Sequence, residues 1–204
     1  MVPVYVDSGA DVRRADRRRA DGPTTRPRTR RTREARRHDR IQHHPTPGPR
    51  NSLQYWTDAK PVWRVMLNYV FVLVARIAPS LKLKLGAQRI GVTVGAGVSW
   101  GLEATPDVFW PELVTIEDDA IIGYDAVILC HEFLQDEYRT GEVVVGERAM
   151  IGAGAIVLPG VEIGAGAQVA ANSLVAADVP PETAVAGVPA EPMARTRDRF
   201  MRQP

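Results

Sequence analysis

The sequence predicts an all-β fold, a parallel β-helix that carries a helical segment and an Arg-rich tail on its N-terminal side. Three observations lead to this prediction. From residue 116 onward the chain repeats every six residues, and the repeat has one long break, after residue 133. The unit just before that break contains His131, the only histidine in residues 51–204. The first fifty residues differ so strongly in composition from the remainder that they cannot belong to the same repeat.

The Arg-rich tail, residues 1–50, contains fourteen Arg and no Lys against six acidic residues, a net charge of +8. It has few large apolar side chains to offset the entropy cost of ordering, so we expect it to be disordered. Clustered Arg residues can bind phosphates, so this segment could bind nucleic acid. We favour instead the interpretation that it is encoded upstream of the true start codon, and we expect no nucleic-acid partner. No apolar run follows the basic residues as a signal peptide requires.

Residues 51–89 are expected to form an N-terminal helical segment. An apolar stripe at steps of three and four residues predicts a helix packed on the body of the protein. The apolar run is shorter than the ~20 residues of a transmembrane span. A helix lying on a membrane surface is the less favoured alternative, suggested by the flanking Arg64, Lys82 and Lys84. The stripe consists of Val62, Met66, Tyr69, Leu73 and Ile77.

The six-residue repeat is the strongest signal in the chain. Its period fits neither an α-helix nor an alternating strand, and is typical of a β-helix in which each unit supplies one short strand and a turn. The first position is Ile or Val in all nine units and should point inward, and the fifth is Ala, Val or Ser in eight of them. Gly at the second position should relieve the backbone at the corners. The units are IEDDAI, IGYDAV, ILCHEF, VGERAM, IGAGAI, VLPGVE, IGAGAQ, VAANSL and VAADVP, starting at residues 116, 122, 128, 145, 151, 157, 163, 169 and 175.

Two interruptions of the repeat predict loops at 101–109 and 133–143. The β-helix domain is expected to span 90–180, with a C-terminal extension at 181–204. Both loops should leave from the same part of the body, and loops on a rigid scaffold are common places for function.

The coils, especially VVVGERAMIGAGAIVLPGVEIGAGAQVAANSLVAADVPPETAVAGVPA, resemble the hexapeptide-repeat acyltransferases, in the branch of galactoside, maltose and xenobiotic O-acetyltransferases. The resemblance covers about residues 90–194. It implies a left-handed β-helix with three units to a turn, a homotrimer, and acetyl-CoA bound between subunits.

The resemblance assigns His131 as the catalytic general base. Imidazole titrates near neutral pH and can remove the proton of an attacking hydroxyl, which is typically worth ~10²- to 10⁴-fold in rate. The activity implied is acetyl-CoA-dependent O-acetyl transfer to a sugar or another small hydroxylated acceptor. An ordinary corner histidine is the less favoured alternative.

Other site residues are expected from the resemblance and from their places in the repeat. The residues expected to bind acetyl-CoA are Ala153, Ala171, Ala176 and Arg195. The Lys that the family often has in the final coil is absent from this sequence. Acceptor-binding candidates are Trp100, Tyr124, Asp125 and Glu137, although Trp100 could instead fill the end of the coil. No metal site is expected, because the body has a single histidine.

Cys130, the only cysteine, excludes an internal disulfide and fits a cytoplasmic protein. We expect it to pack as a small apolar side chain rather than act as a nucleophile, because neighbouring strand residues point to opposite sides. The alternatives to the enzyme are a non-catalytic scaffold of the same fold and an acyltransferase with another acyl donor.

Overall fold

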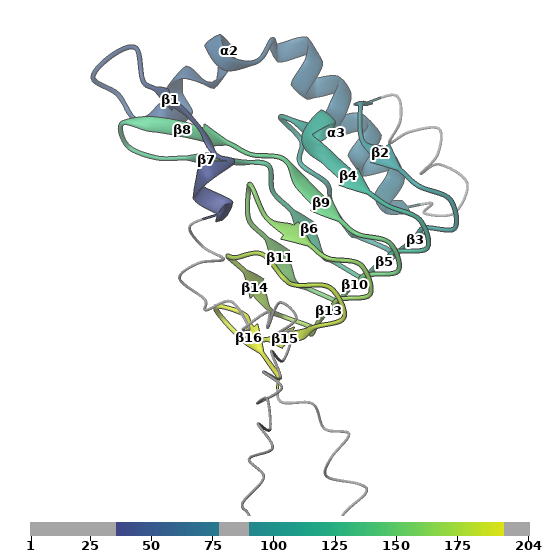
Figure 1. Cartoon of the computed structure of the whole chain (residues 1–204). Coiled ribbons are helices and arrows are strands. Elements are labelled where there is room, and N and C mark those ends of the chain that lie inside the picture. Colours follow the sequence, from purple (N-terminus) through teal and green to yellow (C-terminus); the bar gives the residue numbers. More distant parts are fainter. Residues whose placement is uncertain (1–35, 78–89, 194–204) are drawn as a thin grey trace, which may run out of the picture.

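The six-residue units build short parallel strands that stack into three sheets around a common core (Figure 1). The structure is a computed structural model and describes residues 36–77 and 90–193. Successive units pass from sheet to sheet, so a strand pairs with the unit eighteen residues further on, as in Ile151 with Val169. The first sheet contains β3 (Ser99–Trp100), β5 (Ile121–Ile122), β10 (Met150–Ile151), β13 (Gln168–Val169), β15 (Ala184–Ala186) and β16 (Glu191–Pro192). The second contains β6 (Val127–Ile128), β11 (Ile156–Val157) and β14 (Leu174–Val175), and the third β2 (Thr93–Val94), β4 (Val114–Ile116), β9 (Val143–Val145) and β12 (Glu162–Ile163). The predicted left-handed parallel β-helix is confirmed.

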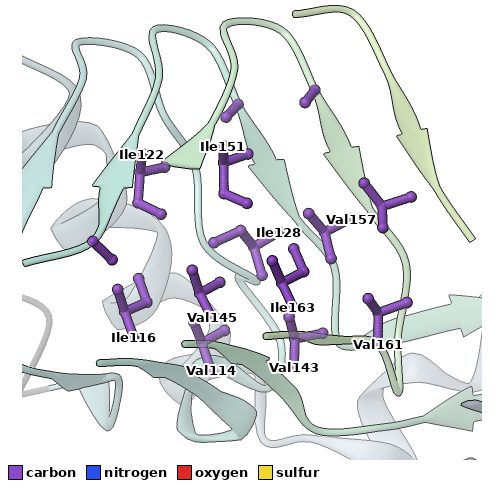
Figure 2. Close-up of a cluster of buried hydrophobic side chains, with 14 of the residues drawn as sticks. Val114, Ile116, Ile122, Ile128, Val143, Val145, Ile151, Val157, Val161 and Ile163 are labelled. Carbon is purple, nitrogen blue, oxygen red and sulfur yellow. The ribbon is translucent and has the colours of Figure 1, made fainter. Parts of the chain in front are cut away.

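The core of the coil is formed by the first position of every unit and the fifth position of every unit except ILCHEF, where Glu132 stands (Figure 2). The first-position Ile and Val side chains are at most 1% exposed, and the small fifth-position residues at most 4%. Each buried aliphatic side chain contributes about 1.5–3 kcal/mol relative to exposure. Regular burial of one large and one small residue per unit therefore holds the coil together.

Glycine at the second position has a different role from the one we expected. At Gly152 an added Cβ would lie 2.4 Å from the backbone nitrogen of Ala171, and at Gly123 it would lie 2.6 Å from that of Ala153. The left-handed backbone angles occur instead at the fourth position, as at Asp125 with φ 53°. Glycine is therefore required by the close approach of the next coil, and the corner conformation is carried two residues later.

A three-stranded antiparallel sheet stands where the repeat is interrupted. Strand β7 (His131–Phe133) forms a hairpin with β8 (Glu137–Thr140), and β1 (Gln42–Pro45) pairs with the other edge of β8. The predicted loop at 133–143 is therefore largely a β-hairpin, and the prediction of a disordered tail up to residue 50 is wrong for residues 36–50. Main-chain pairing along an edge strand needs no apolar side chains, so composition alone did not indicate it. Residues 1–35 lie outside the described part of the chain.

The helical segment packs on the body through another face than the predicted stripe. It comprises η1 (Ser52–Tyr55), α2 (Trp56–Ala59) and α3 (Val62–Ile77). The inward residues of α3 are Val65, Asn68 and Val72, at most 5% exposed. The amide of Asn68 donates a hydrogen bond to the carbonyl of Val108 at 2.8 Å, which fixes the helix in this rotation. The predicted stripe is 37–50% exposed at Val62, Met66, Tyr69 and Leu73, so it was assigned to the wrong face of the helix. The side chain of Ile77 is not among those that the structure describes.

The coil continues beyond its predicted end at residue 180. Ala184 and Val185 in β15 pair in parallel with Gln168 and Val169, which adds one more rung, and β16 then folds back on β15. Among the helices in the described ranges, none has the length and apolar composition of a transmembrane span.

The pairing of β1 with β8 predicts that the segment before residue 46 stabilises the fold. Deletion of residues 1–45 should lower the free energy of unfolding by about 3 kcal/mol relative to deletion of residues 1–35, because it removes several hydrogen bonds of about 1 kcal/mol each and leaves the β8 edge unpaired. Urea unfolding followed by circular dichroism measures the difference. Equal stability of the two truncated proteins would contradict the role of β1.

Candidate active site

His131 stands at the point where the coil turns into the hairpin. It follows the fully buried Cys130 and opens β7, with Thr140 of β8 opposite it. The amide of Gly141 donates to the carbonyl of Cys130 at 2.9 Å, which closes the base of the hairpin. The side chain of His131 is 15% exposed, so it is held by the fold and still reaches solvent.

The imidazole is held by a carboxylate from the other interruption of the repeat. Nδ1 of His131 lies 2.5 Å from Oδ2 of Asp107, whose side chain is fully buried. The backbone amides of Phe109 and Trp110 donate to Oδ1 of Asp107 at 2.8 Å, and the amide of Cys130 donates to Oδ2 at 2.6 Å. These bonds confirm that the two interruptions come from the same part of the body. The prediction missed Asp107, although its position at the end of the 101–109 insertion could have indicated it.

Asp107 is ionised despite its burial. Burial by itself would raise the pKa of the carboxyl, but the hydrogen bond and charge of His131 and the amides of Trp110 and Cys130 together lower the pKa from its ordinary value. A carboxylate accepts at this position, so Nδ1 of the imidazole carries a proton. Nε2 is then free to accept one.

Aromatic rings surround the imidazole. The ring centroids of Phe109, Phe133 and Trp110 lie 4.8, 5.1 and 5.3 Å from that of His131. Trp110 precedes η3 (Pro111–Leu113), and it stacks on Tyr138 of β8 at 5.6 Å. Rings at these distances cover most of the imidazole and restrict its rotation, which favours one fixed orientation.

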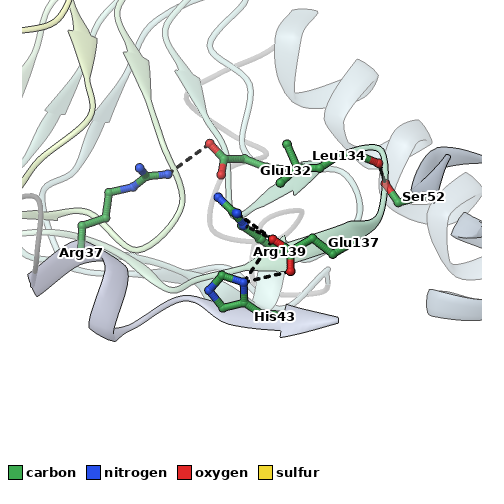
Figure 3. A network of polar contacts seen from close by, with 7 residues as sticks. All are labelled: Arg37, His43, Ser52, Glu132, Leu134, Glu137 and Arg139. Carbon is green, nitrogen blue, oxygen red and sulfur yellow. Dashed lines mark hydrogen bonds and ion pairs between the residues drawn. The ribbon is translucent and has the colours of Figure 1, made fainter. Parts of the chain in front are cut away.

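Glu132 and Glu137 of the hairpin both have basic side chains as partners. Glu132 is bound by Arg37, and Glu137 is bound by His43 and Arg139 (Figure 3). The hydrogen bonds from His43 and Arg139 lower the pKa of Glu137. Glu137, an expected acceptor residue, therefore already has partners within the chain, and no contact with His131 is found in the described residues.

The other predicted acceptor residues also lie apart from the imidazole contacts. Trp100 is 9% exposed in the core, and its indole nitrogen donates to the carbonyl of Ala104, which agrees with the alternative that it fills the end of the coil. Tyr124 and Asp125 form the corner after β5, where Tyr124 is 59% exposed. Among the hydrogen bonds, ion pairs and ring contacts of His131 with the described residues, none involves these three.

The predicted acetyl-CoA residues lie on two corners of the coil. Ala153 and Ala171 are exposed on the corner that also carries Tyr124, since the amide of Gly154 donates to the carbonyl of Tyr124. Ala176 follows β14, in the sheet of β6 and therefore on the corner of His131. Arg195 lies outside the described residues.

Cys130 packs in the core, as expected. Its side chain is fully buried, and burial together with the charge of Asp107 raises the pKa of the thiol far above its usual value. The thiolate form needed for nucleophilic attack is therefore disfavoured. In the described part of the chain no cluster of His, Cys, Asp and Glu could hold a metal ion.

Comparison with known proteins identifies the class. The family model "Bacterial transferase hexapeptide (six repeats)" matches residues 142–177. The repeat and the coil are therefore of the hexapeptide type that this family model describes.

Relatives in sequence narrow the class to a family. The chain is 40% identical over 148 residues to YvoF of Bacillus subtilis (strain 168), named as a candidate acetyltransferase, and the match covers 72% of this chain and 86% of YvoF. It is 36% identical over 140 residues to SAS0727 of Staphylococcus aureus (strain MSSA476), named likewise, with 63% and 87% covered. The chain belongs to the hexapeptide-repeat acetyltransferase family and is an acetyltransferase.

Solved structures share the fold. A maltose O-acetyltransferase from Clostridium difficile 630 superposes with a TM-score of 0.51 at 17% identity, covering 68% of this chain and 87% of that one. The hexapeptide-repeat acetyltransferase VCA0836 from Vibrio cholerae O1 biovar eltor, solved with acetyl coenzyme A, superposes with a TM-score of 0.51 at 23% identity, covering 65% and 86%. These similarities show a common β-helix.

The bond between Asp107 and His131 predicts a large effect of Asp107→Asn on acetyl transfer. An Asn amide at this place would donate to Nδ1 and move the imidazole proton to Nε2, so kcat should fall by about 10²- to 10⁴-fold, as for an orienting carboxylate in other His-based sites. Steady-state kinetics on folded protein measure the effect. A kcat within threefold of the wild type would contradict the assigned tautomer.

Proposed function

We propose that this acetyltransferase transfers an acetyl group from acetyl-CoA to a hydroxyl of a small acceptor, with His131 as general base. The observation that carries the proposal is the bond of 2.5 Å from Nδ1 of His131 to the buried carboxylate of Asp107. It leaves Nε2 as the basic nitrogen, and the surrounding rings restrict the imidazole to one orientation.

Each residue of the pair has a defined part in the reaction. Nε2 of His131 takes the proton of the acceptor hydroxyl while the oxygen attacks the thioester carbonyl. The carboxylate of Asp107 stabilises the imidazolium that forms, without itself accepting the proton. When the carbon–sulfur bond breaks, the imidazolium returns its proton to the sulfur of coenzyme A and the base is regenerated. No acyl-enzyme intermediate is required, in agreement with the buried, protonated thiol of Cys130.

The acceptor is proposed to be a sugar or another small hydroxylated molecule. The support is the resemblance of the coils to the galactoside, maltose and xenobiotic branch, together with aromatic rings beside the base. Such rings pack against the apolar face of a sugar while its hydroxyls remain free to react. Tyr124 and Asp125 stay proposed acceptor residues, because their corner is exposed.

Acetyl-CoA is proposed to lie along the corners that carry Ala153, Ala171 and Ala176, with Arg195 as a phosphate partner. Ala153 and Ala171 are exposed and small, so a long ligand could approach the backbone there. The proposal follows from the family resemblance of these final coils.

A homotrimer is also proposed, with sites between subunits. Its support is apolar exposure on the outer faces of two sheets, where Ile121, Met150 and Ile156 are 36–48% exposed. Sedimentation equilibrium should give three times the chain mass of 22.4 kDa. A monomer across the micromolar range would contradict this assembly.

The enzymatic role of His131 is tested by release of free thiol from acetyl-CoA in the presence of a panel of sugars and other alcohols. His131→Ala should lower kcat by about 10²-fold or more, because the proton acceptor is lost. Cys130→Ala is the matched control: the residue is adjacent and buried, and its loss should leave kcat nearly unchanged. If the wild type neither releases thiol nor binds coenzyme A, the chain is a scaffold and the proposed function fails.

A further inference from the structure

Residues 36–52, which extend to the first residue of η1, lie along the hairpin that begins with His131; we call them the N-terminal strap. Strand β1 pairs with β8 over four residues. Beyond β1, the amide of Thr46 donates to the carbonyl of Asp136 at 2.9 Å, and the amide of Ser52 to that of Leu134 at 3.1 Å. The strap therefore contacts the hairpin along its edge and at its tip.

Arg37 connects the strap to the base of the hairpin. Its side chain is almost fully buried, with Nε donating to the carbonyl of Pro159 at 2.6 Å and Nη2 donating to Oε1 of Glu132 at 3.1 Å (Figure 3). Pro159 belongs to the corner one coil after that of His131, as the bond from Leu129 to Val157 shows. Arg37 thus ties the rigid coil to the residue next to the base.

We propose that Arg37 is a positioning residue for His131, acting through Glu132; this inference rests on the proposed function. His131 and Glu132 are neighbours in a strand, so their side chains leave β7 on opposite sides. Asp107 holds the first and Arg37 holds the second. With both sides held, β7 cannot rotate about its axis without breaking one of these bonds.

Two features make Arg37 suited to this task. A guanidinium has donors in a fixed planar arrangement, so its bonds to a carbonyl and to a carboxylate set the distance between them. Both partners are shielded from water, with Glu132 24% and Arg37 7% exposed at the side chain, which limits screening of the ion pair. Small displacements of a catalytic group have large effects on rate, so holding β7 through Arg37 and Glu132 would affect catalysis by His131.

Arg40 provides a matched comparison on the same turn of the strap. It donates to the carbonyl of Gly160 and pairs with the buried Asp178. Like Arg37, it therefore binds one carbonyl at a corner of the coil and one carboxylate. Unlike Arg37, it has no bond to the hairpin in the contacts we describe. Loss of either Arg removes one anchor of the strap, and only loss of Arg37 releases Glu132.

The first experiment follows the ring nitrogens of His131 by ¹⁵N NMR in the full-length protein, with the signal assigned through His131→Asn. In the wild type, Nδ1 should be protonated and Nε2 unprotonated. Arg37→Met should shift both signals toward the average of the two tautomers, and Arg40→Met should leave them in place. Unchanged signals in Arg37→Met, or equal shifts in both variants, would overturn the proposal.

The second experiment measures kcat at saturating acetyl-CoA for Arg37→Met, Glu132→Gln, the double variant and Arg40→Met. Arg37→Met should lower kcat on the order of tenfold with little change in KM, and the double variant should be no slower than the slower single one. Arg40→Met should lose thermal stability and keep its kcat. Multiplying effects of Arg37→Met and Glu132→Gln would show that Arg37 does not act through Glu132, and the proposal would fail.

The two experiments separate this inference from the proposed function. If no acceptor is acetylated while the His131 signals respond as expected, the proposed activity is wrong and the positioning by Arg37 stands. If acetyl transfer depends on His131 but the ¹⁵N signals of His131 do not change in Arg37→Met, the activity stands and the positioning role is rejected.

Discussion

The close spacing of successive coils is the constraint on which the rest of the structure depends. A Cβ at Gly152 would lie 2.4 Å from the next backbone, so the second position admits no side chain at such points. The inward first and fifth positions are filled by aliphatic and small residues with almost no exposure. A coil packed in this way leaves little room for other side chains within a regular unit. The candidate catalytic residues are therefore found where the repeat is interrupted.

The two interruptions of the repeat together form the candidate active site. The insertion at 101–109 brings Asp107 inward to meet His131, and three backbone amides satisfy its carboxylate. The hairpin begins with the base at the coil corner, and Phe133 of the same strand lies against its ring. Each interruption supplies half of the pair, and the rigid coil between them sets the distance.

The sequence predicted the coil far better than the site. Period and residue size identify the β-helix because every unit repeats the same local packing, and His131 was found because it stands at the break. Asp107 was missed because its partner is 24 residues away. The end of the 101–109 insertion marks the place, but the six-residue pattern does not express the contact itself. The same limitation applies to β1: its backbone pairing with β8 leaves no mark in the composition of an Arg-rich segment. The inward face of α3 was misassigned because apolar residues lie on more than one side of this helix, and the observed face combines Val65 and Val72 with the hydrogen bond from Asn68.

The strap has a consequence for the order in which the protein folds. Neighbouring coils join residues about eighteen positions apart, so the coil can grow rung by rung as the chain emerges. Arg37 and Glu132 are separated by 95 residues, and closing so long a loop costs more entropy than adding a rung. The strap is synthesised before the hairpin and must therefore wait for it, so the geometry around the base is completed late in folding.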